Sequence, residues 1–265
     1  MKDLLKKVKK VKKVNKVKKA ILIVIFVVLF FENGYCEKYD FFINVGNHLG
    51  REILFPFNLK LEDFTVILPV SVITYSLLKN DTYFRDKFSS SKNSTLDFIS
   101  SIDILGDGMF NLALCGVLDV IGGKKERLVT RQVVESIVET GIIVMGIKYL
   151  TGRDRPSANT GSWSFKGPLF LNSDSFPSGH TAVAWTVAEV VGDAYNCHYI
   201  TYSLATLVAL SRVYKDAHWF SDVFVGAVIG VLIGKIHKID YSKEDISLIL
   251  RYEDEKLLYG INYKF

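Results

Sequence analysis

Long apolar runs separated by polar stretches dominate the chain from about residue 60 onward. The runs lack the strict alternation of half-buried strands, and each extends over several helical turns. They predict six helices, near residues 64–79, 105–122, 132–150, 181–195, 199–213 and 222–238. Two polar stretches, 80–104 and 151–179, are expected to be the long loops between them.

The two segments that flank these runs follow other patterns. Residues 37–60 mix aromatic and aliphatic residues with polar ones, which predicts an amphipathic helix covering the core. Near the C-terminus, two apolar runs flank an acidic turn, and the second run partly alternates. This favours a β-hairpin as an appendage to an otherwise all-α chain.

The N-terminal residues have the composition of an export leader. Residues 1–19 contain ten lysines, and residues 20–31 are apolar without interruption. Such an apolar segment rises about 18 Å as a helix, which is short for a membrane span and typical of a signal-peptide core. We expect a signal peptide at residues 1–36, or an uncleaved anchor, and export to the cell envelope or periplasm.

The net positive charge of the chain belongs to this leader. The chain has 33 basic and 28 acidic residues, and without the ten lysines, Asp3 and Glu32 it has 23 basic and 26 acidic residues. The body therefore offers no general field for a polyanion. The apolar run directly after the lysines favours export over nucleic-acid binding, so no nucleic-acid partner is expected.

Acidic residues inside the apolar runs bear on whether the helices cross a membrane. Glu135, Glu139, Glu189 and Asp193 all lie well within runs. Carboxylates are costly in a bilayer, and their spacing fits the polar stripe of a water-facing bundle. The mean hydropathy of +0.22 lies between soluble and membrane classes. We expect a domain that is soluble or associated with the membrane surface, with at most some helices inserted.

Cysteine usage gives no disulfide framework. Cys36 would leave with a cleaved leader, and Cys115 and Cys197 each lie in or beside an apolar run. The two could pair, but buried free thiols are the simpler interpretation.

One stretch with catalytic potential runs from Ser211 to Asp222. It supplies a cation at Arg212, an imidazole at His218 and a carboxylate at Asp222. If a helix begins near His218, the spacing of four places His218 and Asp222 on one face. The carboxylate can then accept one ring N–H and leave the other nitrogen nucleophilic.

Two further stretches supply groups that bind an oxyanion. Lys148 and Arg155 lie where one apolar run ends, and Ser178 precedes another as a predicted N-cap. Backbone N–H groups near Gly179 and His180 would then point outward with the helix dipole behind them, which suits a phosphate. Together the three stretches predict a pocket for a tetrahedral oxyanion.

The motifs Lys-x6-Arg-Pro (148–156), Pro-Ser-Gly-His (177–180) and Ser-Arg-x5-His-x3-Asp (211–222) resemble the three signatures of the type 2 phosphatidic acid phosphatase (PAP2) superfamily. That superfamily also includes bacterial acid phosphatases and vanadium haloperoxidases. The resemblance covers roughly residues 105–238 and implies a six-helix bundle over 37–240, with 241–265 as a separate tail. An up-and-down arrangement would bring the three motifs to one end.

The resemblance also implies a role for each motif residue. His218 would attack phosphorus and form a phosphohistidine, Asp222 would orient it, and His180 would protonate the leaving group. The phosphoryl oxygens would be bound by cations, a hydroxyl and an amide: Lys148, Arg155, Arg212, Ser178 and Gly179. Three cations can neutralise charge that metals neutralise in other phosphoryl transfers, so no metal and no cofactor are expected. The role of Arg153 is left open.

The function implied is an exported, metal-independent phosphatase for monoesters or pyrophosphates of envelope lipids. A phosphorylated lipid and the membrane surface are then the expected partners, and loop 151–179 the expected mouth of the pocket. The alternatives are an acid phosphatase for small soluble esters, a non-catalytic phospholipid-binding protein, and a vanadium haloperoxidase. The last is disfavoured because haloperoxidases of the superfamily are much longer.

Overall fold

The computed structural model describes most of the chain, in residues 41–54, 58–90, 93, 97, 100–168, 173–237, 246–253 and 256–263. The predicted leader, residues 1–36, lies outside the described residues, together with Cys36.

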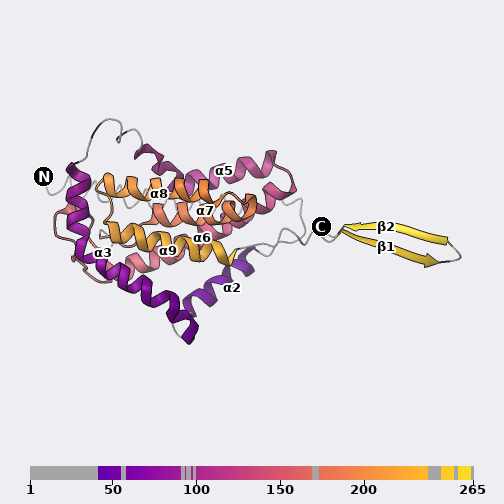
Figure 1. The fold of residues 1–265 in the computed structure, drawn as a ribbon, viewed down its shortest axis with the longest axis horizontal. Coiled ribbons are helices and arrows are strands. Elements are labelled where there is room, and N and C mark those ends of the chain that lie inside the picture. The colour runs from indigo at the N-terminus through magenta and orange to yellow at the C-terminus, as the bar shows by residue number, and fades with distance from the viewer. Residues whose placement is uncertain are drawn as a thin grey trace, which may run out of the picture.

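The described chain is a helical bundle, which confirms the predicted all-α fold class (Figure 1). Short 3-10 turns, η2 (Leu61–Asp63), η3 (Ser101–Gly106) and η4 (Pro156–Ala158), lie between longer elements. The α-helices are α2 (Phe41–Leu54), α3 (Phe64–Ser90), α5 (Gly108–Ile121), α6 (Lys124–Thr151), α7 (Gly179–Tyr195), α8 (His198–Tyr214) and α9 (Phe220–Ile236).

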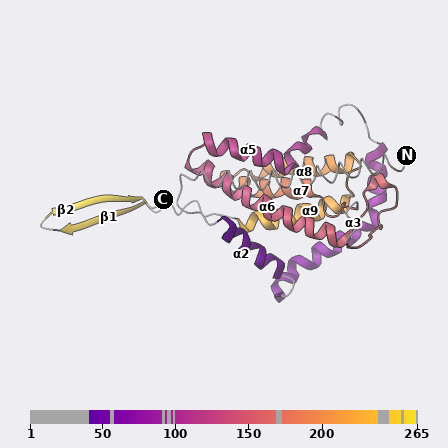
Figure 2. The same cartoon turned by 180° about the vertical axis from the view of Figure 1, so that it is seen from behind.

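Helix α7 lies at the centre of the bundle, against α6, α8 and α9. Figures 1 and 2, seen from opposite sides, both place α7 between these neighbours. Small buried residues on α7, such as Ala182, Ala184 and Ala188, let the other helices approach it closely. The N-terminus of α7 carries the second motif, so this packing determines where the motif lies.

The six helices predicted from the apolar runs correspond to α3 and α5–α9, with two differences in extent. Helix α6 begins at Lys124, earlier than the predicted start at residue 132. Its first two turns are polar, so the apolar pattern behind the prediction does not reach them. The prediction of a polar loop from residue 80 is wrong, since α3 continues to Ser90. Asp81 in the continued part is buried, and the ring of Phe84 stacks on Phe220 at 4.6 Å. Tertiary contacts therefore hold these polar turns in the helix.

The prediction that the acidic residues form a water-facing stripe is also wrong. Glu135, Glu139 and Glu189 are all buried, with exposed fractions of 2%, 0% and 3%. Each carboxylate meets a polar side chain from another element: Glu139 contacts His48 and His237, and Glu189 accepts a hydrogen bond from Tyr202. Buried carboxylates of this kind need such partners, which the pattern of a single helix does not reveal.

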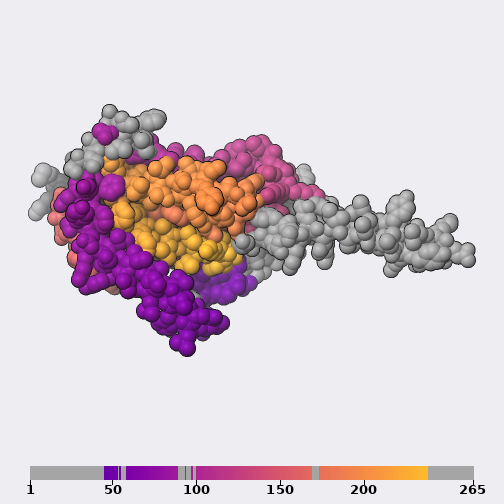
Figure 3. Space-filling view, in the orientation of Figure 1, coloured from indigo at the N-terminus to yellow at the C-terminus, as the bar shows by residue number. Residues whose placement is uncertain are grey.

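Helix α3 differs from the other helices in how much apolar surface it leaves uncovered. The segment Leu61–Phe88 is long and apolar enough to cross a membrane, judged by length and composition, and the bundle buries none of its most apolar part. Figure 3 shows α3 running along the outside of the molecule. Leu68 and Val72 are 58% and 67% exposed.

The predicted amphipathic helix within residues 37–60 is α2, whose Val45 packs into the core beside Leu112 and Val133. In the tail, β1 (Ile246–Glu253) and β2 (Lys256–Tyr263) pair antiparallel, from Ile246 opposite Tyr263 to Glu253 opposite Lys256. Cys115 and Cys197 are free thiols, the first buried and the second half-buried.

Candidate active site

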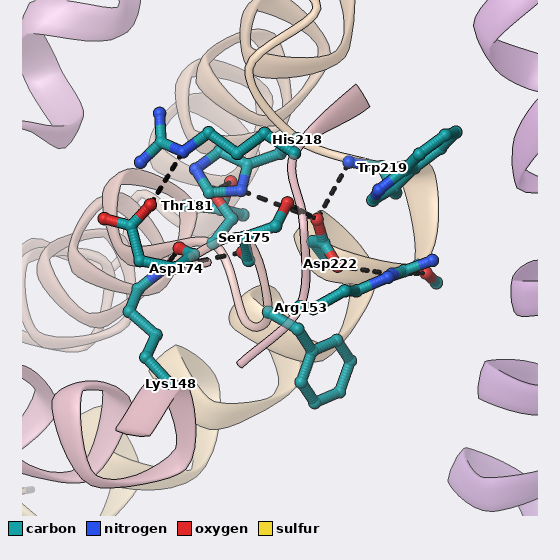
Figure 4. A network of polar contacts seen from close by, with 12 residues as sticks. Lys148, Arg153, Asp174, Ser175, Thr181, His218, Trp219 and Asp222 are labelled. Atoms are coloured by element: carbon teal, nitrogen blue, oxygen red, sulfur yellow. Dashed lines mark hydrogen bonds and ion pairs between the residues drawn. The ribbon is translucent and has the colours of Figure 1, made fainter. Parts of the chain in front are cut away.

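The three motifs meet at one end of the bundle. Lys148 lies in the last turn of α6, Ser178 caps the start of α7, and Arg212 lies in the last turn of α8. His218 precedes α9, and Asp222 lies in its first turn. Figure 4 shows side chains from these elements turned toward one another. Hydrogen bonds and ion pairs connect most of them.

His218 and Asp222 have the relation that their spacing predicts. Nδ1 of His218 lies 3.6 Å from Oδ2 of Asp222, and both side chains are buried. The separation exceeds hydrogen-bond length, so the carboxylate acts on the ring through its charge and needs only a small movement to accept the Nδ1 proton. Burial lowers the pKa of His218 to about 4, and the charges of Lys148 and Arg155 act in the same direction. The imidazole is therefore neutral at neutral pH.

Asp222 is held in place by several donors. Its Oδ2 accepts hydrogen bonds from Oγ of Ser175 at 2.5 Å and from the backbone N–H of Trp219 at 2.9 Å. Its Oδ1 accepts from Nη1 of Arg153 at 2.5 Å. Burial alone would raise the pKa of Asp222, but His218, Arg153 and Ser175 outweigh that effect and hold the pKa below its usual value. Asp222 is therefore an ionised carboxylate with a fixed orientation.

Arg153 connects this carboxylate to the rest of the bundle. Its guanidinium is fully buried and donates to Oδ2 of Asp81 at 2.7 Å and to Oγ of Ser221 at 2.7 Å, as well as to Asp222. Gly152 ends α6 just before it with a φ of 54°, where a Cβ would collide with the carbonyl of Gly167. Glycine therefore permits the sharp turn that directs Arg153 inward.

Lys148 and Arg155 meet at the loop that leads to α7. The Nζ of Lys148 donates to the backbone carbonyls of Asp174 and Ser175, and Nε of Arg155 donates to Oδ1 of Asp174 at 2.9 Å. Arg155 is partly open to solvent. The two cations thus lie on one side of His218, close enough for both charges to depress its pKa.

Arg212 and His180 are neighbours at the same end of the bundle. Nη1 of Arg212 pairs with Oδ2 of Asp103 at 2.5 Å, and Lys215 pairs with the other oxygen of Asp103 at 2.9 Å. Burial and, to a lesser extent, the charge of Arg212 lower the pKa of His180 to about 4. His180 therefore stands next to a cation, where a bound anion would raise its pKa again.

The N-terminus of α7 completes the pocket. Ser178 occupies the N-cap position as predicted, but its side chain makes no capping hydrogen bond, and its Oγ instead accepts from Thr181 at 2.9 Å. The backbone N–H of Ser178 donates to the carbonyl of Asp222 at 2.9 Å, which fixes α7 against α9. A Cβ on Gly179 would lie 4.0 Å from Cε of Lys148, so this amide and this cation are neighbours.

The loop between α6 and α7 is ordered around Asp154. Its carboxylate accepts hydrogen bonds from Thr160, Ser164 and Ser173 and pairs with Lys166. The backbone carbonyl of Asp154 accepts from Nε1 of Trp219 at 2.9 Å. The loop that was expected to form the mouth of the pocket is thereby attached to the segment that carries His218.

Several residues that shape the site were not predicted. Asp81, Asp103, Asp174 and Ser175 lie outside the motifs, and Arg153 had no assigned role. Each of them holds a residue of the motif segments in place. Asp81, Asp103 and Asp174 are acids that pair with arginines of those segments. The motif cations indicate that acidic partners must lie near them in the fold. The sequence does not identify which acids these are.

Known proteins resemble this chain in the same region. Residues 130–244 match the family model described as the PAP2 superfamily. The lipid A 1-phosphatase of Porphyromonas gingivalis is 26% identical over 177 residues, which are 64% of this chain and 36% of that protein. The acid phosphatase of Zymomonas mobilis is 36% identical over 56 residues, 21% of each chain. The chain thus spans 36% or less of the length of these curated relatives.

Two solved structures align with the bundle. The crystal structure of LpxE from Aquifex aeolicus is 28% identical with a TM-score of 0.47 and covers 59% of this chain and 92% of that one. The transmembrane PAP2-type phosphatidylglycerolphosphate phosphatase of Bacillus subtilis is 19% identical with a TM-score of 0.46 and covers 64% and 92%.

Proposed function

The chain belongs to the PAP2 superfamily, and from this premise we propose that it is a phosphoric ester hydrolase acting on the phosphate of a lipid. The observation that carries the proposal is the buried pair of His218 and Asp222, with the charges of Lys148 and Arg155 acting on His218 and that of Arg212 acting on His180. A neutral imidazole beside a fixed carboxylate and facing cations suits nucleophilic attack on a phosphate anion.

In the first step, Nε2 of His218 attacks phosphorus while Nδ1 turns its N–H toward Asp222. The bond to the ester oxygen breaks, and the phosphoryl group is transferred to the imidazole. Lys148, Arg155 and Arg212 neutralise the equatorial oxygens, and the N–H groups at the start of α7 add to this stabilisation. Asp103 and Asp174 hold the arginines in place before the substrate arrives.

His180 serves the leaving group. Its pKa of about 4 in the free protein is raised by the negative charge of a bound phosphate, so that it can donate a proton to the departing oxygen. In the second step, the neutral His180 takes a proton from water as the water oxygen attacks the phosphohistidine. Inorganic phosphate leaves, and both histidines return to their starting states.

A lipid substrate is supported by the similarity to a lipid A 1-phosphatase and by the uncovered apolar surface of α3. Tyr75 of α3 contacts the exposed Trp163 of the loop between α6 and α7, with ring centroids 6.4 Å apart. This contact joins the apolar surface to the loop that leads to the pocket. A membrane resting on α3 could therefore present a lipid phosphate to that loop, and residues 1–36 would direct the protein out of the cytoplasm.

The test is phosphate release by the purified full-length protein with excess chelator. Phosphatidate, undecaprenyl pyrophosphate and p-nitrophenyl phosphate are offered in parallel. We expect release from a lipid, loss of that release in His218→Ala by at least about a thousandfold, and full activity in His198→Ala, which changes a histidine on α8. A 32P label that is transferred from substrate to the wild-type protein, is acid-labile and is absent from His218→Ala would support the phosphohistidine.

The outcomes separate the alternatives. Release from the small ester alone would place the protein with the acid phosphatases. Undiminished release by His218→Ala would refute the mechanism. No release from any substrate, together with saturable binding of the lipids, would favour a binding protein.

A further inference from the structure

A second cluster of titratable side chains lies away from the active site, where α2, α6 and the end of α9 meet. It contains His48 of α2, Glu139 of α6 and His237, the residue that caps α9. Glu139 lies nine residues before Lys148, about 13 Å along α6. The proposed hydrolysis makes no use of this cluster.

The three side chains converge on a small volume. Nδ1 of His48 lies 3.2 Å from Oε1 of Glu139, and Nε2 of His237 lies 2.7 Å from Oε2 of the same carboxylate. One ligand atom from each residue can be chosen so that all lie within 4.8 Å of one another. Ligand atoms around a tetrahedral ion with bonds of about 2.1 Å are roughly 3.4 Å apart, so side-chain movements of up to about 1.4 Å would bring the three atoms to that spacing.

The surroundings of His237 match those of a metal ligand. Its Nε2 faces Glu139, while its Nδ1 lies 3.6 Å from Oε2 of Glu135. A second carboxylate behind the ring is the arrangement that orients a ligating histidine and makes it a stronger donor. Gln132 donates to the backbone carbonyl of His237 at 2.5 Å and fixes the position of the residue. Glu139 and His237 are more than nine-tenths buried.

A further carboxylate lies near the cluster: Glu52 follows His48 by one turn on α2. Both of its carboxylate oxygens are shielded from solvent, and within the described residues neither has a hydrogen-bond partner. The charges of Glu139 and His237 act on it, so it lies near the cluster. A buried carboxylate without a partner is costly, and a cation would remove this cost.

We propose that His48, Glu139 and His237 bind one divalent transition-metal ion. Two imidazoles with a carboxylate suit Zn²⁺ and similar ions better than Ca²⁺ or Mg²⁺, which prefer oxygen ligands alone. The ion joins α2 to α6 and α9, so its role is to stabilise the bundle. It takes no part in hydrolysis.

A second group of possible ligands, Glu189, Asp193 and His198, serves as a contrast. It has one imidazole instead of two, that imidazole of His198 is 31% exposed, and Glu189 already accepts a hydrogen bond from Tyr202. His198→Ala is therefore a matched control for His48→Ala.

The test uses the purified full-length protein, stripped with chelator and titrated with Zn²⁺ by calorimetry. We expect one saturable equivalent and a rise in the thermal unfolding midpoint. Affinity should fall at least about tenfold in His48→Ala and in Glu139→Gln, and remain unchanged in His198→Ala and His218→Ala. Co²⁺ in the same site should give the visible absorption of a four-coordinate ion, and this absorption should be absent in His48→Ala.

Three results would overturn the proposal. These are no saturable uptake by wild type, unchanged uptake by His48→Ala, or loss of uptake in His198→Ala. His48 is partly exposed and its replacement leaves the buried groups in place, so that variant should fold even if Glu139→Gln does not. Because metal uptake and phosphate release are measured separately, failure of either proposal leaves the other intact.

Discussion

Among single residues, Arg153 has the largest influence on the arrangement of the site without facing the phosphate pocket. It donates to Asp222, Asp81 and Ser221 from a fully buried position, so α3, α9 and the carboxylate behind His218 all depend on one guanidinium. Arginine alone has the planar set of donors that this requires. Arg153 is thus a positioning residue for Asp222.

Replacing Arg153 by lysine should separate this positioning from charge. Arg153→Lys keeps the cation but cannot serve three acceptors, so we expect kcat to fall by roughly tenfold or more, equivalent to about 1.4 kcal/mol, with KM nearly unchanged. Steady-state kinetics on the preferred ester measures this. Arg85→Lys, which alters the partly buried pair between Arg85 and Asp216, is the control and should keep full kcat. A rise in KM with kcat unchanged would contradict a positioning role.

The buried His218 gives stability a defined dependence on pH. His218 has a pKa of about 4 in the folded protein and about 6.5 when unfolded, so the unfolded chain binds more protons between these values. Through this residue, the free energy of unfolding should therefore fall by an amount on the order of 3 kcal/mol as the pH drops from 6.5 to 4.

Denaturant unfolding of wild type and His218→Asn across this pH range measures the effect. The variant should lose less stability on acidification, because it has no ring to protonate. Parallel curves for the two proteins would show that His218 does not titrate as described.

At the level of elements, the contact between α7 and α9 sets the geometry of the pocket. Gly226, Gly230 and Gly234 lie along one face of α9, and a Cβ on each would come within 2.6 Å of an atom of α7. The helices are therefore close enough for the Ser178 amide to reach the carbonyl of Asp222. The distance between the N-terminus of α7 and His218 depends on this close approach.

Gly226→Ala should disturb that distance directly, because its Cβ would meet the carbonyl of Ser178 at 2.6 Å. We expect a loss of about 1–3 kcal/mol in stability and reduced activity. Gly146→Ala in α6 is the control: nothing lies within 4 Å of its Cβ, so stability should rise by up to about 1 kcal/mol. Thermal unfolding and phosphate release together measure both effects, and a fully stable, fully active Gly226→Ala would refute this account of the packing.

For the molecule as a whole, the uncovered surface of α3 determines how it meets its surroundings. The polar second half of α3 packs on the bundle through Asp81 and Phe84, while Leu68 and Val72 in the first half are exposed. An apolar surface of this extent marks contact with a membrane or a partner. It lies beside the loop that borders the active site.

Charges placed on this surface should weaken membrane binding without affecting the chemistry. We expect Leu68→Lys/Val72→Lys to bind vesicles of phosphatidylcholine and phosphatidate less than wild type and to hydrolyse p-nitrophenyl phosphate equally well. Tyr199→Lys, at the exposed start of α8 and at the end of the bundle opposite the pocket, should bind as wild type does. Sedimentation with vesicles measures binding. Equal binding by the double variant would exclude α3 as the membrane contact.

The sequence by itself determined the number and order of the core helices, and it predicted which residues would form a phosphate site at one end of them. Both follow from local information: apolar periodicity marks a helix, and the motifs place functional groups where helices begin and end. His218 and Asp222 are four residues apart, so their relation follows from helix geometry alone.

Only the tertiary structure decided which distant residues serve the motifs. Asp81 lies 72 residues before Arg153 and Asp103 lies 109 before Arg212, so no local pattern connects them. The same reason explains the two wrong predictions, the loop at residue 80 and the water-facing acids. The free energy of a polar side chain depends on the partners it meets after folding, and His48, Glu139 and His237 come together only when three helices pack.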